Sequence, residues 1–182
     1  MMGAVDSYQL LLERAKRGDA AAFERLVAEY QPAVFTFCRH VLNDPDEAAD
    51  ATQEAFVAAW LKIGSIRGDL RAWLFKVALN RCRDRLRRLT AARRIGSGDP
   101  PEPPAPDGHP EEALLAAERQ ELVRRALREL EPDQRLAVVL ADLFGYAYTE
   151  IAAITGWPLG TVRSRIHRGR LGLRAALLKR RE

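Results

Sequence analysis

The feature that most limits the fold of this 182-residue chain is a proline-rich segment near its centre. The segment GSGDPPEPPAPDGHP, Gly96 to Pro110, holds six of the ten prolines and three of the twelve glycines. Proline lacks a backbone N–H and fixes its φ angle, so such a run blocks helix and cannot join a packed core. The sequence therefore predicts two domains, residues 1–95 and 111–182, joined by a semi-rigid linker over residues 96–110.

The pattern of apolar residues in the first domain predicts five helices and no convincing strand. The expected helices begin after Asp6 or Ser7, after Asp19, after Pro32, at Pro45 and at Leu70, and the last two end near Ile63 and Arg94. Each start carries a capping side chain or a proline, and Pro32 is expected to separate the second helix from the third. In the last helix Trp73, Val77 and Leu86 are expected to form the buried stripe.

The second domain is predicted to contain four further helices. They are expected over Pro110 to Leu130, Pro132 to Phe144, Tyr148 to Thr155 and Leu159 to Leu178, with Gly145 as a stop. The predicted fold class is therefore all-α, with two small helical domains. Gly169 and Gly172 lie inside the last helix, and each is expected to weaken it by up to about 1 kcal/mol relative to alanine.

The last two helices match the plan of a helix-turn-helix. A short helix, a glycine suited to a left-handed conformation (Gly156) and a second helix after Pro158 follow one another. Val162, Ile166 and Leu173 are expected to face inward. Thr161, Arg163, Ser164, His167 and Arg168 are expected to face outward, where the start of a second helix enters the major groove. The further basic residues, Arg170, Arg174 and 179–181, are expected to meet the DNA backbone.

The charge is arranged in blocks along the chain. The net charge of +4 is the sum of −5 over residues 1–60, +9 over 61–95, −7 over 96–155 and +7 over 156–182. Two basic blocks separated by acidic ones indicate two surfaces for polyanions. Arginine dominates both basic blocks, which favours bidentate contacts with phosphates and bases. The plainer alternative is a pair of solvated helix faces.

Several kinds of site find little support in the sequence. Cys38 and Cys82 lie far apart among apolar positions, so buried thiols are expected rather than a disulfide or a zinc site. Asp50 and Glu54 are one helical turn apart, but no third ligand accompanies them, so no metal or cofactor is expected. No apolar run approaches about 18 residues and no leader-like segment is present, which predicts a cytoplasmic protein without membrane insertion.

Three stretches of the chain resemble a known family. LRELEPDQRLAVVLADLFGYAYTEIAAITGWPLGTVRSRIHRGR, Leu127 to Arg170, resembles region 4 of the extracytoplasmic-function (ECF) sigma factors of bacterial RNA polymerase. DEAADATQEAFVAAWLKI, Asp46 to Ile63, and LRAWLFKVALNRCRDRLRR, Leu70 to Arg88, resemble region 2 of the same family. The resemblance implies a region 2-like bundle followed by a region 4-like helix-turn-helix, in that order along the chain.

The resemblance also implies roles for individual residues. The implied contacts to the clamp helices of core RNA polymerase are Asp50, Gln53, Glu54 and Phe56. The implied contacts to the minus-10 promoter element are Ile66, Arg67, Gly68, Asp69, Asn80, Arg81, Asp84, Arg87 and Arg88. The implied contacts to the minus-35 element are Thr161, Arg163, Ser164, Arg165, His167 and Arg168. Trp73 stands where the family keeps a core tryptophan, and an anti-sigma protein is a further implied partner.

The chain departs from the family pattern at two helix starts. Ala147 stands where a hydroxyl cap is usual, so Thr149 is expected to move the start of that helix by two residues. Leu70 stands near the place of a family phenylalanine in the loop that captures a flipped base.

Three functions are compatible with these patterns. The first is an alternative sigma factor that binds core polymerase, recognises promoter DNA and helps to melt it. The second is a helix-turn-helix regulator that acts without core polymerase and gives the acidic helix and the Asn80 to Arg88 surface no task. The third is an enzyme that acts on nucleic acid. The sequence lacks a convergent nucleophile or acidic cluster for it, so no catalytic residue is predicted.

Overall fold

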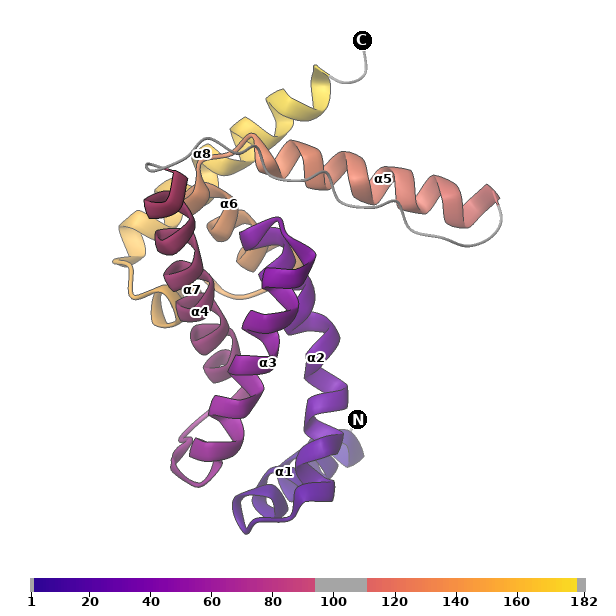
Figure 1. Ribbon diagram of the computed structural model, residues 1–182, viewed down its shortest axis with the longest axis vertical. Helices are drawn as coiled ribbons and strands as arrows, with labels where there is room; N and C mark the ends of the chain where they lie inside the picture. Colours follow the sequence, from indigo (N-terminus) through magenta and orange to yellow (C-terminus); the bar gives the residue numbers. More distant parts are fainter. Residues whose placement is uncertain (1, 94–110, 180–182) are drawn as a thin grey trace. The chain divides into compact units, whose positions relative to one another are not determined.

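The computed structural model describes residues 2–93 and 111–179, and all regular elements of these residues are helical (Figure 1). The elements are α1 (Met2–Lys16), α2 (Ala20–Leu42), α3 (Pro45–Lys62), the short helix η1 (Ile63–Ser65), α4 (Leu70–Arg93), α5 (Glu111–Arg128), α6 (Pro132–Val138), the π-helix η2 (Val139–Leu143), α7 (Tyr148–Thr155) and α8 (Leu159–Leu178). The all-α fold class is confirmed. The predicted linker, 96–110, lies outside the described residues.

The chain divides into two compact units. The N-terminal unit comprises residues 1–42 and 46–89, and the C-terminal unit comprises residues 43–45 and 90–182. The domain limits expected from the sequence, 1–95 and 111–182, stay a prediction. Across the part of the chain that the structure describes, no helix is both long and apolar enough to cross a membrane.

The core of the N-terminal unit is formed by α2, α3 and α4. The rings of Phe37 and Phe75 pack with centroids 5.0 Å apart and join α2 to α4. One face of α3 consists of fully buried alanines, namely Ala48, Ala51, Ala55 and Ala59. Small side chains on that face allow the neighbouring helices to approach closely. The opposite face of α3 is thereby left to solvent and to partners.

The expected helix break at Pro32 is wrong. α2 runs unbroken from Ala20 to Leu42 with Pro32 inside it. The proline is exposed, so its ring meets solvent rather than the core. Proline inside a helix costs about 3 kcal/mol. Burial on both sides of it, by Leu26 before and Val34 and Phe37 after, offsets that cost.

At two helix starts, the capping side chains predicted from the sequence form hydrogen bonds with the first turn of the helix. Asp19 Oδ1 accepts a hydrogen bond from the Ala22 N–H at 3.1 Å, and Asp69 Oδ1 accepts one from the Arg71 N–H at 2.9 Å. The first helix differs, because α1 already begins at Met2, ahead of the expected caps at Asp6 or Ser7.

The prediction of which residues of α4 are buried is also wrong. Trp73, Val77 and Leu86 are only half-buried. The positions that face the core are Leu70, Leu74, Phe75, Ala78, Leu79, Cys82 and Arg85. Apolar residues occur on more than one face of α4, so the apolar pattern alone does not decide which face is buried, and it gives no sign that Arg85 is buried with them. Cys38 and Cys82 are both buried free thiols, as expected.

The core of the C-terminal unit lies between α6, η2 and α8. Leu136, Val139 and Leu140 pack there with Val162 and Ile166, all of which are nearly or fully buried. α6 continues into η2, so the predicted 132–144 helix ends in a π-helical turn. Gly145 follows with φ +69°, a conformation that favours glycine, and stops the helix as expected.

Gly169 and Gly172 serve close packing, a role that was not predicted. A Cβ on Gly169 would lie 2.6 Å from Val138 Cγ2 and 2.9 Å from the carbonyl oxygen of Gln134. A Cβ on Gly172 would lie 2.6 Å from Leu130 Cδ2. α8 nevertheless continues to Leu178, so contacts with α6 and the end of α5 replace the helix propensity that glycine lacks.

Candidate polymerase and nucleic-acid interfaces

The helix-turn-helix is built by α7, a three-residue turn and α8. Gly156 takes a left-handed conformation with φ +76°, and its N–H donates to the carbonyl of Ala152 at 2.9 Å. The Thr155 hydroxyl donates to the Ile151 carbonyl at 2.7 Å and accepts from the Trp157 N–H at 3.3 Å. These bonds satisfy the end of α7 and fix the direction in which α8 leaves the turn.

α7 begins at Tyr148, so the expected shift of its start towards Thr149 is wrong. The Ala147 N–H donates to the carboxylate of Glu150 at 2.6 Å. This is the glutamate half of a capping box, which satisfies a backbone donor although residue 147 has no hydroxyl.

The outward face of α8 carries the side chains predicted to contact the minus-35 element. Arg163, His167 and Arg168 are exposed, while Thr161 and Ser164 are half-buried. The Ser164 hydroxyl donates to the Thr161 carbonyl at 3.0 Å. Positions 163 and 167, and likewise 164 and 168, are one turn apart, so they share one face of the helix. The structure thus brings these five residues together at the start of α8.

Arg165 and Arg170 hold α8 in place, whereas the sequence reasoning assigned them to DNA. The Arg165 guanidinium lies 2.6 Å from Asp133 Oδ2 and stacks 3.9 Å from the centre of the Trp157 ring. Arg170 Nε donates to Asp142 Oδ2 at 3.0 Å, and this bond raises the pKa of Arg170. The two acidic partners lie in α6 and η2, so the arginines fasten the second helix of the motif to the unit's core.

The 64–69 loop exposes most of the residues predicted to bind the minus-10 element. Arg67, Gly68 and Asp69 are exposed, and Gly68 has φ +85°. Ile66 differs, because its side chain is only 4% exposed and belongs to the core. Its apolar side chain anchors the loop, so the neighbours of Ile66, rather than Ile66 itself, are available to a nucleotide.

The outer face of α4 continues this basic surface. Asn80, Arg87 and Arg88 are exposed, and Arg81 and Asp84 are half-buried. Arg87 lies 3.4 Å from Asp84 in an ion pair along the helix. Asn80, Asp84 and Arg88 follow one another at intervals of one turn, so they form a single row of hydrogen-bonding groups.

The predicted polymerase contacts on α3 are exposed with one exception. Asp50, Gln53 and Glu54 face solvent, whereas Phe56 is only 9% exposed and lines a groove. Glu54 accepts hydrogen bonds from Arg85, which lower the pKa of its carboxyl below the ordinary 4.5. The carboxylate is therefore charged at neutral pH.

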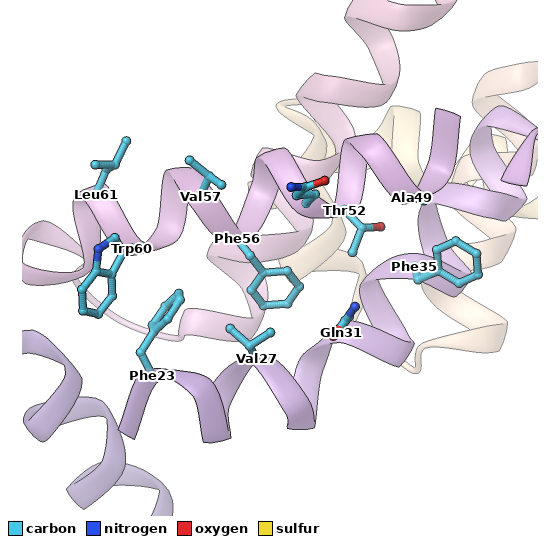
Figure 2. A pocket seen from close by; sticks show the side chains of 11 residues that line it. Phe23, Val27, Gln31, Phe35, Ala49, Thr52, Phe56, Val57, Trp60 and Leu61 are labelled. Carbon is cyan, nitrogen blue, oxygen red and sulfur yellow. The ribbon is translucent and has the colours of Figure 1, made fainter. Parts of the chain in front are cut away.

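An apolar groove lies beside these residues, between α2 and α3. Its volume is about 750 Å³ and Phe23, Val27, Phe35, Phe56 and Trp60 are among its lining residues. Figure 2 shows the rings of Phe23 and Phe56 pointing into the space between the two helices. The rings of Phe23 and Trp60 lie 5.0 Å apart at one end of it.

The sequence reasoning missed an apolar ridge on the same helix. Val57 is 53% exposed and Leu61 is 77% exposed, and with Gln53 they stand one turn apart along α3. The ridge borders the groove on one side and, on the other, a hollow of about 430 Å³ that Glu54 and Arg81 also line. Val57 and Leu61 stand one turn apart on the side of α3 opposite its alanines, and this second apolar row is the signal in the sequence from which the ridge could have been found.

The described residues contain no cluster of three or more histidine, cysteine or acidic side chains placed to hold a metal. The hydrogen bond between the Cys38 and Cys82 thiols, together with burial, raises the pKa of Cys82, so that thiol is protonated at neutral pH. The described residues instead present a ridged acidic helix, α3, and two arginine-bearing faces, on α4 and α8.

Two parts of the chain match known protein families. Residues 26–92 match the family described as Sigma-70 region 2, and residues 120–173 match the family described as Sigma-70, region 4. The first match contains α3, the loop and all but the end of α4, and the second contains the helix-turn-helix.

Individual relatives match over nearly the whole chain. The chain is 35% identical over 181 residues to the RNA polymerase sigma-H factor of Pseudomonas aeruginosa, and the match covers 93% of each protein. It is 36% identical over 174 residues to the ECF RNA polymerase sigma-E factor of Escherichia coli K12, covering 89% of this chain and 90% of that one.

Two solved structures have a similar fold. CnrH, solved in complex with the cytosolic domain of CnrY, matches with a TM-score of 0.69 and 28% identity over 94% of this chain and 97% of CnrH. The sigma factor RpoE, solved with the anti-sigma factor NepR from Bartonella quintana, matches with a TM-score of 0.67 and 29% identity over 86% of this chain and 96% of RpoE. This chain therefore belongs to the extracytoplasmic-function family of RNA polymerase sigma factors and is an alternative sigma factor.

Proposed function

We propose that α3 binds core RNA polymerase, that the 64–69 loop and α4 bind the minus-10 element, and that α8 binds the minus-35 element. The observation that carries this proposal is the composition of α3. The helix exposes Gln53, Val57 and Leu61 in one row beside the charged carboxylate of Glu54. An exposed apolar ridge flanked by polar groups is typical of a protein interface.

The alternative of a regulator that acts without polymerase gives this ridge no partner. Such a regulator needs only α7 and α8 to reach DNA, and the exposed apolar side chains of α3 would then face water. The ridge therefore favours a sigma factor that docks on polymerase first and recognises DNA in its company.

The two basic faces suit different forms of DNA. On α8, Arg163 and Arg168 can bond guanine edges in the major groove, and His167 or Ser164 can reach bases or phosphates. On α4, Asn80 and Asp84 can bond the edges of unpaired bases while Arg87 and Arg88 hold phosphates. The first arrangement suits duplex DNA and the second suits a melted strand.

The proposed function also includes where the protein acts and how it is regulated. The chain acts in the cytoplasm as a non-catalytic subunit, and it is held inactive by an anti-sigma protein until released. The similar protein RpoE supports an anti-sigma partner, since it was solved in complex with the anti-sigma factor NepR.

The first experiment is gel filtration of the full-length protein with bacterial core polymerase. The double variant Gln53→Ala/Leu61→Ser removes an amide and an apolar side chain from the ridge without touching the core, and it should abolish co-elution. Leu10→Ser is the matched control, because Leu10 is 61% exposed on α1 of the same unit. Glu54 is left intact here, since it also pairs with Arg85.

Co-elution of the wild type and of Leu10→Ser, with loss in the double variant, supports the proposed polymerase surface. Absence of any complex with the wild type, while duplex DNA is still bound, would favour the regulator instead.

A further inference from the structure

A buried arginine joins α4 to α3 in the N-terminal unit. The side chain of Arg85 is 10% exposed, and its Nε lies 2.8 Å from Glu47 Oε2. Its Nη2 donates to Glu54 Oε1 at 2.9 Å and its Nη1 donates to Glu54 Oε2 at 3.4 Å. A planar guanidinium that engages both oxygens of a carboxylate fixes the plane of that carboxylate as well as its position.

Glu54 keeps part of its carboxylate available to a partner. Its side chain is 48% exposed, and it borders the hollow next to Gln53, Val57 and Leu61. A carboxylate offers about four lone-pair directions, of which the fork of Arg85 takes two. Arg81 Nε lies 3.4 Å from Oε2 on the exposed side. The half-exposed carboxylate therefore lies at the hollow that Gln53, Val57 and Leu61 also line.

We propose that Arg85 is a positioning residue for polymerase binding, which holds the Glu54 carboxylate in the orientation that the polymerase meets. The inference rests on the proposed function of the α3 surface. Arg85 itself is too buried to reach a partner. Its effect is to restrict the glutamate side chain before binding, so that little rotamer freedom is lost when the complex forms.

The surroundings of Glu54 agree with this role. The hydrogen bond from Arg85 is the main reason that the pKa of Glu54 is low, followed by the charges of Arg81 and Arg88. Without Arg85, two neighbouring carboxylates of α3 lose the cation that they share. A lysine at the same place would supply charge but only a single point of attachment.

The test is a double-mutant cycle on the affinity of full-length protein for bacterial core polymerase. The variants are Arg85→Gln, Glu54→Gln and the combination of both. Arg85→Gln is expected to weaken binding by roughly three- to tenfold, the cost of immobilising one long side chain at an interface. In the Glu54→Gln background the same change is expected to have no further effect, because there is no carboxylate left to position.

Two controls separate positioning from folding and from net charge. Glu47→Gln removes the other carboxylate partner of Arg85 and leaves the fork on Glu54, so it is expected to lower stability without lowering affinity. Arg25→Gln removes one exposed positive charge from α2 of the same unit, and it is expected to change neither the stability nor the affinity. Arg85→Lys is expected to bind core polymerase with an affinity between those of the wild type and of Arg85→Gln. If Arg85→Gln does not fold, Arg85→Lys replaces it in the double-mutant cycle.

The outcomes distinguish the inference from the function on which it rests. If Glu54→Gln weakens binding and Arg85→Gln or Arg85→Lys does not, the positioning role is wrong while the polymerase surface stands. If Arg85→Gln weakens binding equally with and without Glu54, Arg85 acts through the fold and the inference is overturned. If the wild type binds no core polymerase, both fail.

Discussion

Arg163 and Arg165 lie two positions apart on α8 and have different surroundings. Arg163 is exposed, whereas Arg165 is stacked on Trp157 and paired with Asp133. A guanidinium over an aromatic ring contributes about 0.5 to 1 kcal/mol, and an ion pair at a partly exposed site contributes up to about 1 kcal/mol. Arg163 therefore stays exposed, where we propose that it contacts DNA, while Arg165 stabilises the helix that carries both.

Alanine substitution should separate these two roles. Arg165→Ala is expected to lower the free energy of unfolding by about 1 to 2 kcal/mol, from the ring and carboxylate contacts combined. Arg163→Ala is expected to leave that free energy unchanged and to weaken binding to duplex DNA. Urea unfolding and fluorescence anisotropy measure the two quantities. Equal loss of stability in both variants would contradict the assignment.

Gly169 allows a second comparison at the residue scale. Gly169→Ala is expected to destabilise the protein by about 1 to 3 kcal/mol, because the added Cβ overlaps Val138 and the Gln134 carbonyl. Gly160→Ala in the same helix is the control, since nothing lies within 4 Å of a Cβ there. Thermal unfolding of both variants checks the difference. A gain in stability at Gly169, as helix propensity alone predicts, would show that α6 and α8 are not so closely packed.

These residues also show how far sequence reasoning reaches. Gly156, Val162 and Ile166 were predicted correctly, since turn chemistry and helical periodicity are local. The packing of Arg165 was missed, because its partner Asp133 lies in another helix and a helical pattern does not reveal such a partner, and its contact with DNA stays a prediction. The burial of Ile66 was also missed, because helical periodicity does not apply to a residue in a loop.

At the scale of elements, α3 combines two functions on two faces. Its alanines pack against the unit's core, and its opposite face carries the ridge of Gln53, Val57 and Leu61. Arg85 links this helix to α4, which carries the residues proposed to bind the minus-10 element. The surfaces that we propose for polymerase and for the minus-10 element thus lie on two helices that share an ion-pair cluster.

The cluster predicts how stability depends on pH. The pKa of Glu54 is lower in the folded protein than the ordinary 4.5, so its ionised form stabilises the fold. That contribution is fully present above about pH 4.5 and is lost as the pH falls through the folded pKa. Because the side chain is half exposed, its magnitude is no more than about 1 kcal/mol.

Urea unfolding of the wild type and of Glu54→Gln from pH 7 to pH 3 measures this contribution. The wild type should be the more stable at pH 7, and the difference should shrink below about pH 4.5. A difference that stays constant over the whole range would show that the charge of Glu54 is not what stabilises the fold.

Helix limits were predictable where caps are local and failed where packing decides. The start of α4 after Asp69, the end of α7 at Gly156 and the start of α8 after Pro158 follow from single residues. The continuity of α2 through Pro32 does not, since it depends on apolar residues before and after the proline finding the same core. The buried stripe of α4 was misplaced because α4 carries apolar residues on more than one face, and contacts with other helices decide which of them are buried.

At the scale of the whole molecule, each unit has a core of its own. Phe37 and Phe75 belong to one core, and Leu140 and Ile166 belong to the other. Domains with separate cores can fold independently. The surfaces proposed to bind polymerase and the minus-10 element lie in the first unit, and the helix-turn-helix lies in the second.

Two fragments test this independence and the predicted domain limits. Residues 111–182 alone are expected to unfold cooperatively and to bind duplex DNA with an affinity that falls steeply with salt. Residues 1–95 alone are expected to bind core polymerase. Circular dichroism during heating and binding assays on each fragment provide the measurements. A fragment that melts without a cooperative transition would show that its core needs the rest of the chain.

The ion-pair cluster around Arg85 has a consequence for inheritance. One guanidinium serves the carboxylates at positions 47 and 54, so a neutral residue at 85 would leave two like charges on α3 without their common cation. Each acidic residue is in turn favourable only while the arginine is present. Among descendants of this sequence, replacements at 47, 54 and 85 should therefore be acquired together, and the order in which they arise should matter.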